Sequence, residues 1–182
     1  MTLSMGLFLI GILGLSCLST SIFKQQDQAL AQQYIQIIKY RNLVIDLGNG
    51  VKTNAQLTYP AIGKRPFPGV LLISGSGAND KNGTLGFVHK NGPKPPTPYW
   101  QIAQYLSERG FAVLRYDKRG VGTNFTILDT NVWGNATINN LIHDAEKALN
   151  VLIQQPEVDP KRISIIGHSE GTLYAPRVAI DN

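Results

Sequence analysis

The order of apolar and polar positions after residue 35 predicts strands that alternate with helices. Two strand-like runs fill residues 35–59 on either side of Asn49-Gly50, a dipeptide typical of a type I′ hairpin turn. Dense apolar runs then predict buried strands at residues 70–74, in the stretch FAVLRYD and at residues 162–166. The chain therefore begins its folded part with a hairpin and continues with three single strands.

Helical spacing separates these strands. Thr97-Pro98 predicts a helix start, and an apolar set before Gly110 marks the helix: Trp100, Ile102, Ala103, Tyr105 and Leu106. A second helix is predicted at residues 138–154 from one apolar stripe: Leu141, Ala145, Ala148, Leu149 and Leu152. A third helix follows residue 171, with Pro176 expected in its first turn or close to it, and its apolar stripe is Thr172, Leu173, Ala175, Val178 and Ala179.

This alternation predicts an α/β fold. Parallel strands need crossover connections, so the pattern favours a doubly wound, mostly parallel sheet with an N-terminal antiparallel hairpin and helices on both faces. In such sheets the active groups collect beyond the C-terminal ends of the strands. Three loops are therefore expected at one edge, namely SGSGAND, DKRGVGTN and GHSEG. The glycine- and proline-rich loop at residues 75–98 is too long to be a simple connection, which favours a functional role.

The stretch Gly167-His-Ser-Glu-Gly171 has the pattern of a serine nucleophile on a sharp turn. A predicted strand precedes it and a predicted helix follows it, which is the context that this motif requires. Glycine at positions 167 and 171 removes the Cβ atoms that would obstruct a tight reversal. Ser169 would then lie at the apex with its hydroxyl exposed.

The segments LLISGSGAND, AVLRYDKRGVGTN and ISIIGHSEGTLYA, in this order, resemble the strand-3 loop, the strand-4 signature and the nucleophile turn of the α/β-hydrolase superfamily. The resemblance covers residues 44–180 and is strongest to the serine esterase, dienelactone-hydrolase-like and prolyl-oligopeptidase-like branch. It implies that Ser169 is the nucleophile and that the backbone N–H groups of Ser76 and Glu170 bind the oxyanion. Ser74 stands where this family usually has histidine.

This resemblance implies a serine hydrolase that cleaves a carboxylic ester of a small-molecule acyl substrate through an acyl-serine intermediate. A thioesterase or a serine peptidase of the same fold is the alternative. A serine hydroxyl needs an imidazole to take its proton and a carboxylate to orient that imidazole. In this superfamily the chain order is nucleophile, acid, histidine.

The histidines of this chain all precede Ser169. His168 fits the variable position of the motif, His143 fits a solvated helix face, and His89 lies in the long loop, where contact with substrate is an alternative. Asp181 is the one carboxylate after Glu170. Residues 35–182 are therefore expected to be the N-terminal part of a single, C-terminally incomplete α/β-hydrolase domain that is inactive alone. A noncatalytic truncated module is the other interpretation.

Composition narrows the classes of protein and of binding partner that remain. The 182 residues are 43% hydrophobic, which suits one globular domain with a core. The net charge of +5 comes from scattered lysines and arginines, so an evenly basic surface is favoured over nucleic-acid binding. No metal-ligand spacing, G-x-G-x-x-G or Walker motif occurs, and no cofactor or metal is expected. The resemblance implies that the Asp-x-Arg-Gly turn of Asp117 and Arg119 braces its loop, and a catalytic pair is the alternative. The Glu170 side chain is interpreted as pointing away from the nucleophile, and an acid is the alternative.

Residues 1–31 have the character of a signal peptide. An apolar run at residues 7–18 precedes Ala29-Leu30-Ala31, a small-x-small cleavage pattern, although no basic residue precedes the run. We expect export to a secreted or extracytoplasmic location. The alternative is an uncleaved membrane anchor over residues 7–23, with the protein associated with the membrane through this segment. The single cysteine, Cys17, lies in this leader, which excludes an internal disulfide.

Overall fold

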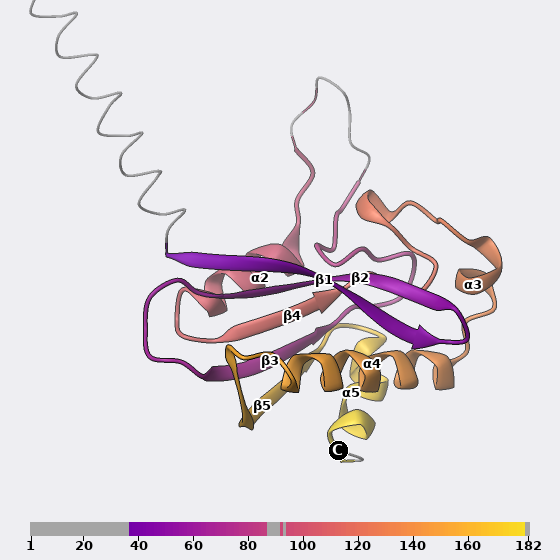
Figure 1. The fold of residues 1–182 in the computed structure, drawn as a ribbon. Helices are drawn as coiled ribbons and strands as arrows, with labels where there is room; N and C mark the ends of the chain where they lie inside the picture. Colours follow the sequence, from indigo (N-terminus) through magenta and orange to yellow (C-terminus); the bar gives the residue numbers. More distant parts are fainter. Residues whose placement is uncertain (1–36, 87–91, 93, 181–182) are drawn as a thin grey trace, which may run out of the picture. The chain divides into compact units, whose positions relative to one another are not determined.

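A five-stranded mixed sheet organises the chain in the computed structural model, which describes residues 37–86, 92 and 94–180 (Figure 1). The strand order is β1-β2-β4-β3-β5. The strands are β1 Ile38–Gly48, β2 Val51–Pro60, β3 Phe67–Ile73, β4 Ala112–Tyr116 and β5 Val158–Gly167. β2 runs antiparallel to β1 and to β4, whereas β3 runs parallel to β4 and to β5. The predicted α/β class with an N-terminal antiparallel hairpin is confirmed.

The hairpin turns where the sequence predicts. Asn49 and Gly50 have φ values of +52° and +77°, and a type I′ turn needs positive φ at both central positions. The twist of this turn matches the twist of the two strands, so β1 and β2 pair from Ile38 and Pro60 down to the turn.

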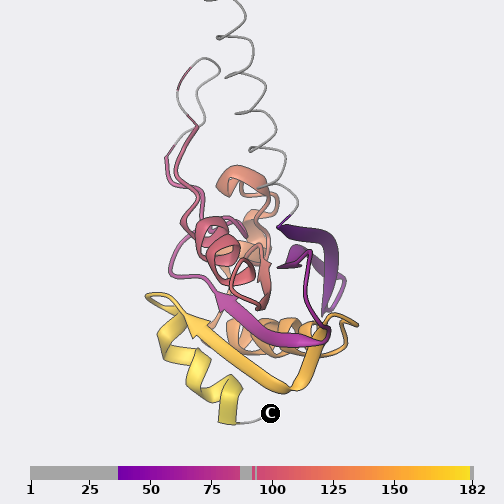
Figure 2. The ribbon, with the colours of Figure 1, turned by 90° about the vertical axis from the view of Figure 1, so that its left-hand side faces the viewer.

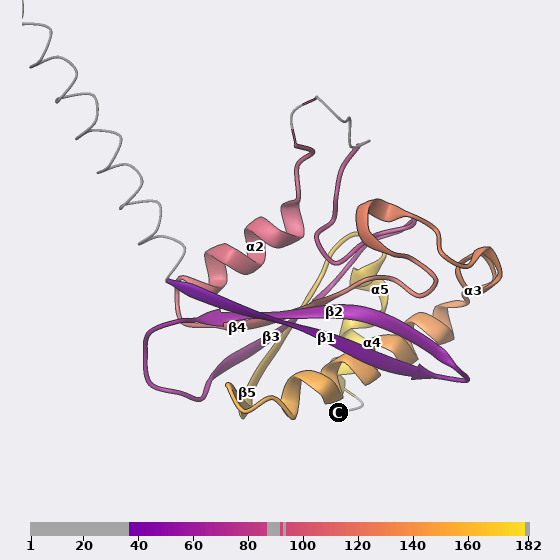
Figure 3. The ribbon, with the colours of Figure 1, turned by 45° about the horizontal axis from the view of Figure 1, so that its top comes forward.

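Helices cover both faces of the sheet. They are α2 Pro98–Ser107, α3 Thr130–Gly134, α4 Ile138–Ile153 and α5 Gly171–Ile180, with a short 3-10 helix, η1, at Thr123–Phe125. Figure 3 shows α2 on one side of the sheet and α4 with α5 on the other. Alternate side chains of β3 divide accordingly, because Val70 and Leu72 pack with α2 whereas Leu71 and Ile73 pack with α4 and α5. The sequence patterns did not predict η1 and α3.

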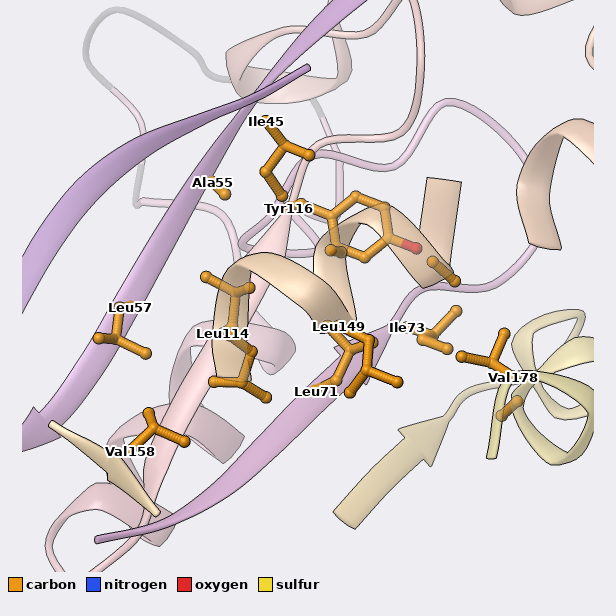
Figure 4. Packing of buried hydrophobic residues seen from close by; sticks show 14 of the residues in the cluster. Ile45, Ala55, Leu57, Leu71, Ile73, Leu114, Tyr116, Leu149, Val158 and Val178 are labelled. Carbon is orange, nitrogen blue, oxygen red and sulfur yellow. The ribbon is translucent and has the colours of Figure 1, made fainter. Parts of the chain in front are cut away.

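The larger core lies between the sheet and the pair α4 and α5. Side chains from the hairpin, β3, β4 and both helices meet there (Figure 4). The predicted stripe of α4 is confirmed, since Leu141, Ala145, Ala148, Leu149 and Leu152 are all buried. A capping box between Thr137 and Asn140 fixes the start of this helix.

The strand predicted at residues 162–166 is confirmed, but the prediction that it is buried is wrong. β5 starts earlier, at Val158, and contains Pro160. Ile163 and Ile165 are half-buried, whereas Ser164 and Ile166 are exposed. The reason is position, because β5 is the outer strand of the described sheet at the end opposite β1, and α4 and α5 contact one of its faces (Figure 2).

In α2 and α5 the buried face differs from the face that the sequence pattern predicts. α2 buries Tyr99, Ala103 and Ser107, while Ile102 and Tyr105 are exposed. α5 buries a set that leaves out the predicted Leu173, namely Gly171, Tyr174, Ala175 and Val178. Pro176 is the sixth residue of α5, so it lies in the second turn and not in the first. At the starts of these helices, the Tyr99 hydroxyl accepts a hydrogen bond from the Gly75 N–H and Gly171 packs against the end of β3.

Candidate active site

The candidate site lies where β3 and β5 end side by side. Their last residues, Ile73 and Gly167, are register partners. The chain leaves β3 toward α2 on one face and leaves β5 toward α5 on the other. Loops that diverge in this way leave a crevice at the C-terminal edge of a parallel sheet. The His168 N–H donates to the Ile73 carbonyl at 3.0 Å, which holds the two chain exits together.

Ser169 occupies the turn between β5 and α5. Its φ is +51°, a left-handed value that is rare for a residue with a Cβ, and the residue is exposed. A Cβ on Gly167 would lie 2.5 Å from the Gly171 carbonyl oxygen, and one on Gly171 would lie 2.8 Å from the Ser74 carbonyl oxygen. Both positions therefore require glycine. The predicted sharp strand-to-helix turn is confirmed, and α5 starts directly against the end of β3.

The loop after β3 closes over this turn. A Cβ on Gly75 would lie 2.9 Å from Ser169 Cβ, so only glycine permits this approach. The Gly75 N–H donates to the Tyr99 hydroxyl at 3.2 Å. Within the described residues, the amides of Ser76 and Glu170 donate to no protein acceptor. The two predicted oxyanion donors thus belong to loops in contact, and their N–H groups are available.

The loop after β4 joins the other two through Lys118. This side chain is buried, and its Nζ donates to the Gly75 carbonyl at 2.9 Å and to Glu170 Oε2 at 2.6 Å. Its own N–H donates to the Asn79 carbonyl at 2.9 Å. The prediction that the three loops meet at one edge is confirmed, and the Glu170 carboxylate is bound by Lys118.

Asp117 and Arg119, on either side of Lys118, are bound by other segments. Asp117 is fully buried and accepts from the Lys81 N–H at 2.6 Å. Burial raises the pKa of Asp117 above its ordinary value, although Lys81 acts in the opposite direction. Arg119 donates twice to Asp144 of α4 at 2.7 Å, and these hydrogen bonds raise the pKa of Arg119. Both contacts match the interpretation of these residues as braces.

No described histidine bonds to Ser169. His168 Nδ1 lies 2.9 Å from the Tyr99 hydroxyl. His143 is half exposed on α4, with Nδ1 3.4 Å from Glu146 Oε2. His89, Asp181 and the leader at residues 1–31 lie outside the described residues. In the part of the chain that the structure describes, the Ser169 hydroxyl also has no hydrogen-bond partner.

Further residues that hold the site were not singled out from the sequence. Asp80 is buried and accepts from the N–H groups of Thr84 and Asn124 at 2.9 and 2.8 Å, which anchors the start of the long loop. Where this loop returns, the Leu85 N–H donates to the Pro96 carbonyl at 2.9 Å. Asp80 lies in the quoted SGSGAND stretch, but a sequence pattern does not reveal its partners.

No group of three or more histidine, cysteine, aspartate or glutamate side chains is placed to hold a metal ion among the described residues. None of the described helices combines the length and apolar character that crossing a bilayer requires.

A mixed sheet with this strand order and with the serine turn at the C-terminal edge of its parallel strands defines the α/β-hydrolase fold. Solved structures share it: a dienelactone hydrolase-like promiscuous phosphotriesterase from metagenomic libraries has TM-score 0.55 at 18% identity, covering 79% of this chain and 54% of its own. A bacterial heroin esterase has TM-score 0.55 at 19% identity, and the match covers 87% of this chain and 45% of the esterase. Esterase Est22 has TM-score 0.58 at 14% identity, and the match covers 80% of this chain and 39% of Est22.

Sequence comparison adds two relatives. The chain is 34% identical to esterase EstD of Thermotoga maritima over 125 residues, which are 68% of this chain and 26% of EstD. It is 28% identical to the Escherichia coli K12 protein YfhR over 104 residues, which are 57% of this chain and 34% of YfhR. The chain thus spans between a quarter and about a third of these relatives. No family model matches it. Sequence and fold together relate the chain to the α/β-hydrolase superfamily.

Proposed function

We propose that the full-length protein is a serine hydrolase that cleaves carboxylic esters, with Ser169 as the nucleophile. One observation carries the proposal: the exposed Ser169 turn, with φ of +51°, lies in contact range of the Gly75 loop. The two loops bring an exposed hydroxyl together with the available N–H groups of Ser76 and Glu170. The relative EstD and the structural neighbours named as esterases support ester hydrolysis as the reaction.

In the proposed reaction the Ser169 oxygen attacks the ester carbonyl carbon while its proton passes to an imidazole. The negative charge that develops on the carbonyl oxygen is bound by the Ser76 and Glu170 N–H groups, each worth about 3–4 kcal/mol in comparable enzymes. The alcohol leaves with that proton, and water then releases the acid from the acyl-serine. His168 is engaged by Tyr99. We therefore assign the base and its carboxylate to residues that the structure does not describe.

A fluorophosphonate probe tests the nucleophile in the full-length protein. Labelling should occur at Ser169, and Ser169→Ala should abolish it and lower p-nitrophenyl ester turnover about 10⁴-fold or more. Ser164→Ala is the matched control, because it removes an exposed serine of β5 and should leave both readouts unchanged. Labelling and turnover that persist in Ser169→Ala would assign the nucleophile elsewhere.

We also propose that residues 1–31 direct export of the protein. The support is the apolar run at residues 7–18 followed by Ala29-Leu30-Ala31. Mass spectrometry of the protein from its native host should then find an N-terminus near Gln32. An intact Met1 in the membrane fraction would instead support the anchor.

A further inference from the structure

The peptide that joins Gly75 to Ser76 is held at its carbonyl end by a buried cation. Lys118 Nζ donates to the Gly75 oxygen at 2.9 Å, and Lys118 is only 7% exposed. Asn79 Nδ2 donates to the same oxygen at 2.9 Å. On the other side of Gly75, its N–H donates to the buried Tyr99 hydroxyl at 3.2 Å. Hydrogen bonds on both sides of Gly75 thus restrict rotation of this peptide.

The orientation of this peptide decides where the Ser76 N–H points. The Gly75 C=O and the Ser76 N–H belong to one planar trans unit, so they point in opposite directions. Fixing the oxygen toward Lys118 therefore fixes the Ser76 N–H away from Lys118. The Lys118 ammonium beside the carbonyl oxygen also polarises the amide. This polarisation strengthens the hydrogen bond that the Ser76 N–H can donate.

The same ammonium reaches the second proposed donor. Lys118 Nζ lies 2.6 Å from Glu170 Oε2, and Glu170 supplies the other N–H. One buried side chain on the β4 loop thus links the two donor-bearing residues, which come from the loops after β3 and β5.

We propose that Lys118 is a positioning residue that sets and polarises the oxyanion site. The inference rests on the proposed function, since it requires Ser169 to form a tetrahedral intermediate and an acyl-serine. Lys118 acts through the Gly75–Ser76 peptide and through Glu170, and it touches neither substrate nor the reacting atoms. Its effect falls on the transition state, where the carbonyl oxygen carries charge, and not on binding of the neutral ester.

The test compares Lys118→Met with the wild-type full-length protein in p-nitrophenyl ester hydrolysis. We expect kcat to fall about 10- to 100-fold, less than the loss of a whole donor, with KM changed less than about 3-fold. Lys81→Met is the matched control, because it removes another lysine that pairs with a buried carboxylate, Asp117 at 3.4 Å, without touching the Gly75 peptide. Its kcat should stay within about 3-fold of wild type.

A spectroscopic readout separates positioning from general support of the fold. The stretching frequency of the acyl-serine carbonyl, measured by isotope-edited infrared spectroscopy, reports the hydrogen bonds that this oxygen accepts. Lys118→Met should move it to higher wavenumber, and Lys81→Met should not. If Lys118→Met does not fold, Lys118→Gln takes its place. Because glutamine keeps a neutral donor and loses the charge alone, its loss of kcat and its shift in carbonyl frequency should have the same direction and a smaller size.

The outcomes distinguish the two proposals. If fluorophosphonate fails to label Ser169 in the wild type, the proposed function fails and this inference fails with it. If the wild type is labelled and active while the Lys118 variant keeps its kcat and carbonyl frequency, only the role of Lys118 is overturned. An equal loss of kcat in Lys81→Met would also overturn it. The loss would then follow from removing any buried ion pair near the sheet edge and would not be specific to Lys118.

Discussion

Ser169 has a backbone conformation that most residues avoid. A left-handed φ costs a residue with a Cβ about 1–2 kcal/mol. Here the turn is held by the N–H groups of Gly171 and Thr172, which donate to the His168 and Ser169 carbonyls at 2.8 and 2.9 Å. Strain that neighbouring bonds maintain is a frequent property of functional sites. In this chain it places a small polar side chain outward at the end of a strand.

This strain predicts an order of stability for two variants. Ser169→Gly should be more stable than Ser169→Ala by about 1 kcal/mol, because glycine adopts φ of +51° without the Cβ penalty but loses more backbone entropy on folding. Urea unfolding of both variants measures the difference. Neither variant carries the hydroxyl, so the comparison isolates the backbone. An alanine variant as stable as the glycine variant would show that the turn is unstrained.

At the level of elements, the loop after β3 is attached to the rest of the fold by Asp80. Burial alone would raise the pKa of this carboxyl, but hydrogen bonds from Thr84, Asn124 and Asn82 outweigh burial and hold the pKa below its ordinary value. A lowered folded-state pKa means that the ionised carboxylate stabilises the folded state above pH ~4, the unfolded value. This contribution is lost as pH falls through the folded-state pKa.

Asp80→Asn should therefore be less stable than wild type at pH 7, and the difference should shrink below pH ~4. Urea unfolding at pH 7, 5, 4 and 3 measures this. Asp46→Asn is the control, because it alters an exposed carboxylate of β1 with one hydrogen bond, to the Gly48 N–H. A deficit in Asp80→Asn that stays constant from pH 7 to pH 3 would contradict the assignment of the effect to the Asp80 charge.

Local sequence patterns predicted which segments form helices, strands and turns better than they predicted what those segments pack against. The hairpin turn at Asn49 and the stripe of α4 depend on neighbours in the sequence, and both are confirmed. The exposure of β5 depends on which strands lie beside it, and a run of isoleucines does not contain that information. Lys118 joins partners 43 and 52 positions away, so its role required the folded structure. The resemblance indicated Ser169, whose turn lies where the motif predicts.

At the level of the whole molecule, three tyrosines are built into the core and the site. Tyr99, Tyr116 and Tyr174 are at least 93% buried, and burial raises the pKa of each hydroxyl. The folded state therefore resists their ionisation, while the unfolded chain ionises near pH ~10. The contribution of these groups to the free energy of unfolding is fully present below pH ~10. It is lost as pH rises toward the folded-state pKa values.

We expect alkaline unfolding to be cooperative and coupled to tyrosine ionisation. Absorbance at the phenolate band and circular dichroism should change together above pH ~10. Tyr116→Phe removes one of the ionisations and should make the loss of stability with pH less steep. Phenolate absorbance from the buried tyrosines that rises fully before the fold is lost would contradict this coupling.

The hydrogen bond from the Leu85 N–H to the Pro96 carbonyl joins the two ends of the long loop's outer stretch. The chain before it is anchored to the sheet, since Arg115 of β4 donates to the Lys81 carbonyl at 3.0 Å and to Asn82 Oδ1 at 2.7 Å. An insertion beyond the hydrogen bond of Leu85 and Pro96 should cost little, because doubling the length of a flexible loop adds only about 0.6 kcal/mol of closure entropy. A segment grafted between Leu85 and Pro96 should therefore leave the residues around Ser169 in their present geometry.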